Sequence, residues 1–96
     1  MFEIEVSEPG QVVIKGRLDA AKAGSAEEFL GAIDGVFVID LSELEYISSA
    51  GLGVLLKTHK RLMVSSGGLR LVNVKNHIND VFKYSGFDKL FVIETS

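Results

Sequence analysis

The segment DLSELEYISSAGLGVLL, residues 40–56, decides the fold, because it changes from a strand pattern to a helix pattern within a few residues. Its centre, residues 45–53 (EYISSAGLG), places two serines and an alanine between an apolar run and two glycines. A helix is expected to begin near Ser48 and Ser49, where one of the two hydroxyls should cap it by accepting a hydrogen bond from a free backbone N–H. Beyond the glycines, one stripe recurs at the helical spacing of three and four: Leu52, Leu55, Leu56, His59, Leu62 and Met63.

Strand and helix patterns alternate on both sides of this segment. Apolar and polar residues alternate over residues 2–7, and a Pro-Gly turn leads to residues 11–17, which predicts a hairpin. Residues 36–40 (VFVID) form a nearly continuous apolar run, the pattern of a central strand buried on both faces. Two further strands are expected at residues 69–74 and 90–93.

The other two helices have recognisable start and stop signals. In the first, the start is open between a capping box of Ser25 with Glu28 and an earlier turn near Lys22. In the last, Asn76 is the expected cap and Gly86 is placed to end the helix in a left-handed conformation. The element order is therefore ββαβαβαβ, in which helices pack against a mixed sheet that is mostly parallel after the hairpin.

Length and composition narrow the class of protein. A chain of 96 residues can bury one core, so residues 1–96 are expected to form a single domain. The amino terminus is acidic and no apolar run is long enough to cross a bilayer, which favours a cytoplasmic protein without membrane insertion. Cysteine is absent, which excludes disulfides, thiolate nucleophiles and the common structural zinc sites. No cofactor or metal is predicted.

The charge is unevenly distributed along the chain. The net charge of −3 argues against non-specific nucleic-acid binding. Residues 1–49 hold ten acids and three bases, whereas residues 50–96 hold seven bases and three acids. Lys57, Lys60 and Arg61 lie off the apolar stripe of the central helix, where they form either a basic partner surface or an ordinary solvated helix flank.

An enzymatic role for the serines finds little support. A serine in a strand-to-helix turn followed by x-Gly is half of a G-x-S-x-G nucleophile elbow, but Ile47 stands where the first glycine belongs. No carboxylate lies between Ala50 and Asn79 to complete a triad with His59 or His77. The protein is therefore not expected to be an enzyme.

Phosphate binding by a glycine-rich loop is incomplete too. Gly51 and Gly53 begin a G-x-G-x-x-G pattern whose third glycine is replaced by Leu56, and no P-loop lysine follows. Without side chains at a helix start, the two glycines would instead keep the approach to Ser49 clear for a partner backbone or a nucleotide phosphate.

Residues 40–56 resemble the signature of the STAS domain of anti-sigma factor antagonists, which runs D-L-S, several residues, an apolar residue, D-S-x-G-L-G and then an apolar helix. Further similarity covers GRLD at residues 16–19, LVNV at 71–74 and VFKYSGFDKLFVI at 81–93. The resemblance implies a stand-alone STAS domain with helices mainly on one face of its sheet. It also implies a binding protein of transcription regulation, a monomer, that frees a sigma factor by binding an anti-sigma factor that is a GHKL-type serine kinase.

The resemblance also assigns residues. The kinase phosphorylates the serine of D-S-x-G, which is Ser49 here, and the complex then separates. Ser48 replaces the family's aspartate, so phosphorylation of Ser48 and constitutive binding stay open. The alternative function is a STAS regulatory subunit of a lipid-transport ABC transporter. The expected partner surface contains Asp19, Ser48, Ser49, Ala50, Gly51, Leu52, Gly53 and Lys57.

Overall fold

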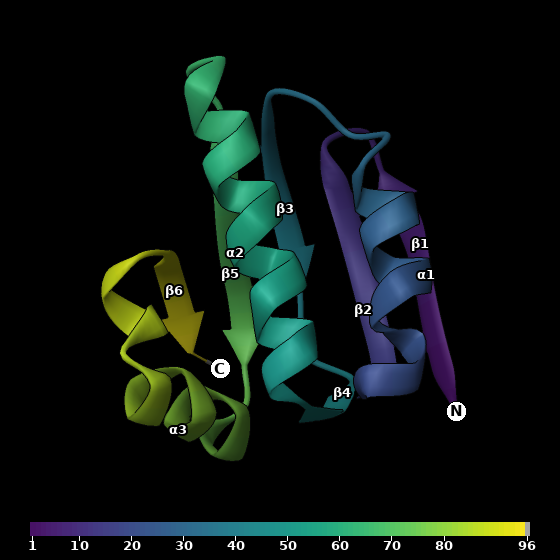
Figure 1. The fold of residues 1–96 in the computed structure, drawn as a ribbon, viewed down its shortest axis with the longest axis vertical. Coiled ribbons are helices and arrows are strands. Elements are labelled where there is room, and N and C mark those ends of the chain that lie inside the picture. The colour runs from purple at the N-terminus through teal and green to yellow at the C-terminus, as the bar shows by residue number, and fades with distance from the viewer. Residues whose placement is uncertain (96) are drawn as a thin grey trace.

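Six strands and three helices make up the structure, a computed structural model that describes residues 1–95 (Figure 1). None of the helices in this range is long and apolar enough to span a bilayer. The strands are β1 (Phe2–Glu8), β2 (Gln11–Leu18), β3 (Val36–Asp40), β4 (Leu44–Ile47), β5 (Gly68–Val74) and β6 (Val92–Thr95). The helices are α1 (Ala20–Leu30), α2 (Ser49–Val64) and α3 (Asn76–Ser85), with a 3-10 turn at Phe87–Lys89.

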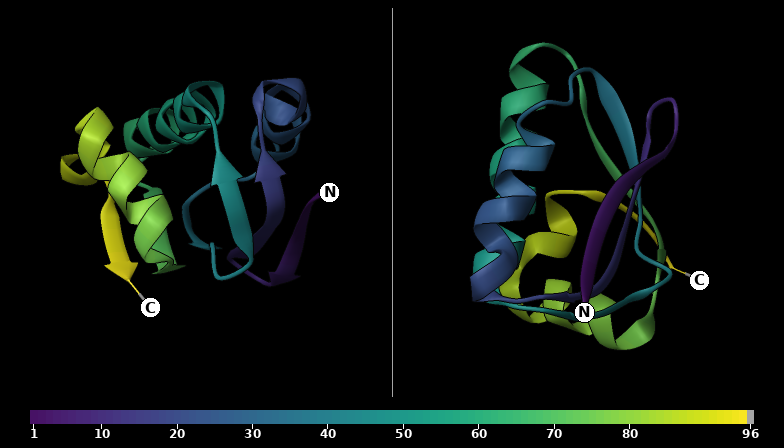
Figure 2. Two further views of the ribbon diagram at one scale, coloured as in Figure 1. Left: turned by 90° about the horizontal axis from the view of Figure 1, so that it is seen from below. Right: turned by 90° about the vertical axis from the view of Figure 1, so that its right-hand side faces the viewer.

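The strands form one mixed sheet in the order β1-β2-β3-β5-β6, with β4 beside the last residues of β2. The hairpin of β1 and β2 is antiparallel, and all other pairs are parallel. This confirms the predicted α/β class with an initial hairpin and a mostly parallel remainder. Helices α1 and α2 lie side by side over the same face of the sheet, as predicted, and α3 contacts β4 and the 3-10 turn (Figures 1 and 2).

The core fills the space between this face and the helices. One stripe of each long helix points inward, as the apolar spacing in the sequence requires. Alternate residues of the central strands meet these stripes. The fully buried side chains include Ile14, Leu18, Leu30, Ile39, Leu55, Leu62, Leu71 and Phe82.

The prediction that β3 is buried on both faces is wrong. Ile39 faces the core and is fully buried, but Val36 is 61% exposed and Val38 is only half-buried. The reason is topological: the chain adds β3 and then β5 on the same side of β2, and right-handed crossovers in one direction place both helices over the same face. Among residues 1–95 no helix covers the other face.

Several element boundaries differ from the predicted ones. Asp19, not Ser25, caps α1, because its carboxylate is the acceptor at the end of β2. Lys75 precedes α3 as its N-cap residue without a side-chain bond, and Asn76 is the first helical residue, so the predicted Asn76 cap is wrong. Gly86 does end α3 with a φ of 78°, as predicted. The connection before α2 contains the unpredicted strand β4, and β6 starts two residues later than predicted.

Candidate functional site

The predicted site lies at the end of the sheet where β2 and β4 finish and α1 and α2 begin (Figure 1). Leu18 and Ile47 are paired at the ends of these two parallel strands. The backbone N–H of Ser48 donates to the carbonyl oxygen of Leu18 at 2.9 Å. Because Asp19 follows Leu18 directly, this bond brings the first turns of the two helices together.

Each helix has a side-chain cap at this point. The Asp19 carboxylate Oδ1 accepts from the backbone N–H of Lys22 at 3.1 Å. The Ser48 Oγ accepts from the backbone N–H of Gly51, also at 3.1 Å, which confirms that one of the two serines caps the helix. Ser48 is half-buried, and its hydroxyl is committed to the local structure.

Ser49 has a different environment one residue later. It is the first helical residue of α2, it is exposed, and within residues 1–95 its hydroxyl makes no hydrogen bond to the protein. Ala50 beside it is also exposed. The positive end of the helix dipole lies at this turn. The arrangement can therefore accept an anion on Ser49 without rebuilding the helix start.

The next three residues of the predicted partner surface differ in their exposure to solvent. Gly51 and Leu52 are buried, so they cannot present a surface to a partner, and that part of the prediction is corrected. A Cβ atom on Gly51 would lie 2.8 Å from Cγ of Leu18, so this glycine permits close packing of α2 and opens no approach. Gly53 is exposed with open space around it, as expected.

Two basic residues of α2 contact α1 and the loop that follows it. Lys57 Nζ lies 3.1 Å from Oε1 of Glu27, and both side chains are largely exposed. Arg61 donates to the backbone carbonyls of Leu30 and Ile33 at 2.9 Å each, which closes the end of α1. This role of Arg61 was not predicted, since nothing in the sequence shows which carbonyls a surface arginine will reach. An open hollow of about 370 Å³ lies between α1 and α2, beside Glu27, Lys57 and Arg61.

Neither histidine hydrogen-bonds to Ser48 or Ser49. His59 Nδ1 accepts from the backbone N–H of Leu69 at 2.9 Å, and the ring packs 5.0 Å from that of Phe91. His77 is exposed, and its Nε2 lies 2.9 Å from the carbonyl oxygen of Glu45. In the described part of the chain no three His, Asp or Glu side chains gather to hold a metal ion.

One contact near the site was not predicted from the sequence. The guanidinium of Arg17 lies 4.4 Å from the ring centroid of Tyr46, a cation–π contact between β2 and β4. A register shift between Gly16 and Arg17 brings this pair together, and such a bulge leaves little trace in a strand pattern.

Comparisons with known proteins agree with this geometry. A family model described as "Mlab, STAS domain" matches residues 3–94. The candidate anti-sigma factor antagonist BtrV of Bordetella bronchiseptica is 46% identical over 59 residues, which are 62% of this chain and 51% of that protein. The match thus spans about half the length of this relative.

Two solved structures show the same fold. An anti-sigma factor antagonist from Mycobacterium paratuberculosis is 26% identical with a TM-score of 0.78, over 100% of this chain and 86% of that chain. The Bacillus cell fate determinant SpoIIAA in its phosphorylated form is 23% identical with a TM-score of 0.69, over 100% of this chain and 93% of that chain. At that identity the likeness to SpoIIAA concerns the fold alone.

Proposed function

The chain belongs to the STAS domain family, and on this premise we propose that it is an anti-sigma factor antagonist switched by phosphorylation of Ser49. In its unmodified form it binds an anti-sigma factor that is a GHKL-type serine kinase, which frees a sigma factor in the cytoplasm. Phosphorylation by that kinase then separates the two proteins. The observation that supports this most is the exposed hydroxyl of Ser49 at the start of α2, which has no hydrogen-bond partner among residues 1–95.

Ser49 is a better phosphoacceptor than its neighbour for a structural reason. The Ser48 hydroxyl is half-buried and caps α2 through the N–H of Gly51. A phosphate on Ser48 would have to replace or distort that cap, which is worth about 1 kcal/mol. The Ser49 hydroxyl can be modified without breaking a bond of the fold. Ser48, which stands at the position of the family's aspartate, is the cap of α2.

The electrostatics of the site favour a switch that leaves the fold intact. A phosphoserine adds about −1.5 to −2 charges, which the amino end of a helix stabilises by roughly 0.3 to 1 kcal/mol. A partner packed over Ser49 would have to desolvate the same dianion. A loss of about 3 kcal/mol at that interface weakens binding by a factor on the order of 10². Phosphorylation thus changes the interface far more than the domain.

The partner surface of the proposed antagonist is small and exposed. It consists of Ser49, Ala50 and Gly53 on the first turns of α2, with the α1 cap Asp19 alongside. Lys57 lies eight residues beyond Ser49, about 12 Å along the helix axis, and extends the surface toward α1. The protein acts as a monomer that binds and is not a catalyst, because the reactive chemistry belongs to the kinase.

Replacing Ser49 with aspartate tests the proposal. We expect Ser49→Asp to weaken binding to the GHKL-type anti-sigma factor kinase of the source organism by about 100-fold in calorimetric titration, with the melting temperature within a few degrees of the parent. The matched control is Ser65→Asp, which places the same charge at the exposed far end of α2. Undiminished binding by Ser49→Asp, or an equal loss in both variants, would exclude Ser49 as the switch.

The transporter subunit is the second candidate, since the matching family model is described by Mlab rather than by an antagonist. A tagged chain would then recover an ABC ATPase from cells and no sigma factor regulator. The antagonist function predicts the opposite pair of results.

A further inference from the structure

The sheet has an open face that the site above does not use. Residues alternate between the two faces of a strand, and Val12, Ile39 and Leu71 belong to the core beneath the helices. Their neighbours Val13, Val38 and Val72 therefore point to the opposite side. Val13 is only 7% exposed although it is not part of the helix-covered core. Val13 is therefore already covered by its neighbours, and the half-buried Val38 and Val72 carry the accessible apolar surface at this point of the open face.

One carboxylate lies in the middle of these valines. Asp40 pairs in register with Val13 on one side and with Val72 on the other. Leu41, the next residue, is fully buried in the core, which fixes Asp40 on the open face. Asp40 is half-buried, and its Oδ1 accepts from the backbone N–H of Ser42 at 2.8 Å. Within residues 1–95 no ion pair neutralises it.

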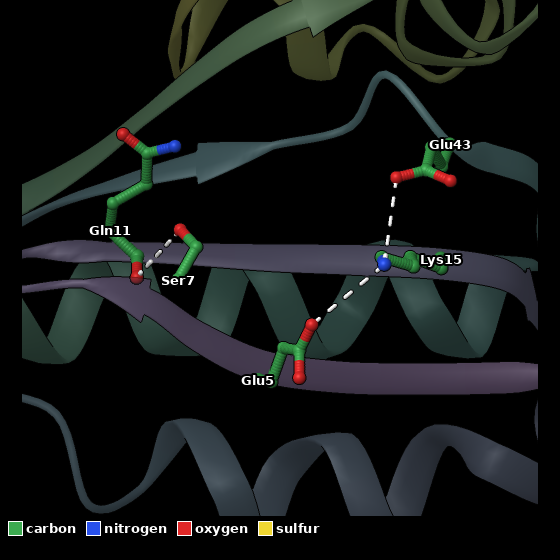
Figure 3. A network of polar contacts seen from close by, with 5 residues as sticks. All are labelled: Glu5, Ser7, Gln11, Lys15 and Glu43. Atoms are coloured by element: carbon green, nitrogen blue, oxygen red, sulfur yellow. Dashed lines mark hydrogen bonds and ion pairs between the residues drawn. The ribbon is translucent and has the colours of Figure 1, made fainter.

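Two cations on this face already have carboxylate partners. Lys15 Nζ lies 3.8 Å from Oε1 of Glu5 and 3.7 Å from Oε2 of Glu43, which reach it from opposite sides (Figure 3). Arg70 is paired with Glu94. A third cation on this face, Arg17, lies over the Tyr46 ring. Among residues 1–95 no cation is paired with Asp40, which lies between Val13 and Val72. A cation on another molecule could form an ion pair with Asp40.

We propose that this open face, the half-buried surface of Val38, Asp40 and Val72, docks a basic amphipathic helix of a partner protein. An arginine or lysine of that helix pairs with Asp40, and its apolar side chains cover Val38 and Val72. A helix of about 14 residues is roughly 21 Å long, which fits a domain with extents of 30 × 27 × 22 Å. A second copy of the chain fits poorly, because two such faces would bring like charges together. Nucleic acid and anionic membranes are disfavoured for the same reason.

The surface is separate from the Ser49 site. Ser49 begins α2, which packs on the other face of the sheet (Figure 2). A helix on the open face would therefore stay bound after phosphorylation of Ser49. The inference does not depend on the role of Ser49, and the two can fail independently.

A designed peptide tests the docking surface. The probe is a helical peptide of about 14 residues with leucines on one face and arginines on its flanks, and the matched peptide has glutamate in place of arginine. In an NMR titration of the ¹⁵N-labelled domain we expect the arginine peptide to shift the amides of Val13, Val38, Asp40 and Val72 at low salt. Equal binding of both peptides, shifts confined to the helices α1 and α2, or no shifts would overturn the proposal.

A charge-neutral variant examines the role of Asp40. Asp40→Asn keeps an Oδ1 acceptor for the Ser42 N–H, so the turn should survive, and we expect the arginine peptide to bind about five- to tenfold more weakly. The control Asp80→Asn makes the same change on an exposed residue of α3 and should alter the affinity less than about twofold. Equal affinity for Asp40→Asn and the parent would remove Asp40 from the surface.

Discussion

Replacing Gly51 with alanine should destabilise the domain, because the start of α2 is packed directly on the end of β2. The new Cβ would lie 2.8 Å from Cγ of Leu18, 2.9 Å from its carbonyl oxygen and 2.9 Å from Cγ1 of Ile47. Carbon atoms in good contact are about 3.5 to 4.0 Å apart. The carbonyl oxygen cannot turn away, since it accepts the N–H of Ser48. Overpacking of this kind costs about 1 to 3 kcal/mol, and the higher helix propensity of alanine returns at most about 1 kcal/mol.

The same substitution two residues later is the control. Gly53 has no atom within 4 Å of an added Cβ, so Gly53→Ala should gain the helix propensity alone and stabilise the domain by up to about 1 kcal/mol. We therefore expect the two variants to differ by about 1 to 3 kcal/mol in urea unfolding followed by circular dichroism, and by at least about 4 °C in melting temperature. If Gly51→Ala is as stable as Gly53→Ala, the close packing of the α2 start is refuted.

Two further substitutions examine contacts around the site. Ser48→Ala removes the hydroxyl that caps α2 and should lower the free energy of unfolding by about 1 kcal/mol, whereas Ser48→Asp should keep the cap; no loss in urea unfolding of the alanine variant would show that the cap is not needed. Arg61→Lys should lose about 1 to 2 kcal/mol, because a single ammonium cannot reach both carbonyls at the end of α1 as the guanidinium does; unchanged stability would show that the two bonds contribute nothing.

The fold was largely predictable because its strongest signals are local. The stripe of α2, the Pro-Gly turn of the hairpin and Gly86 after α3 each belong to one short segment. The open face of β3 was not predictable from its own residues, since VFVID has the composition of a fully buried strand. Whether a second layer covers a strand depends on the direction in which later strands are added, which a local pattern does not contain.

The site shows the same division between local and tertiary information. A serine cap at the start of α2 was predictable from the local pattern, whereas the choice of Ser48 over Ser49 comes from the structure. The burial of Gly51 and Leu52 and the packing of Arg61 on α1 depend on where Leu18, Leu30 and Ile33 lie in three dimensions. A glycine in a helix start can open a surface or admit a neighbouring element, and only the tertiary structure distinguishes the two.

Intact-mass spectrometry after incubation with kinase and ATP measures the phosphoacceptor directly. The parent chain, Ser49→Ala and Ser48→Ala are each mixed with the purified GHKL-type anti-sigma factor kinases of the source organism. We expect a single added phosphate on the parent and on Ser48→Ala, and none on Ser49→Ala. An unmodified parent chain, or a phosphate that persists on Ser49→Ala, would contradict the role assigned to Ser49.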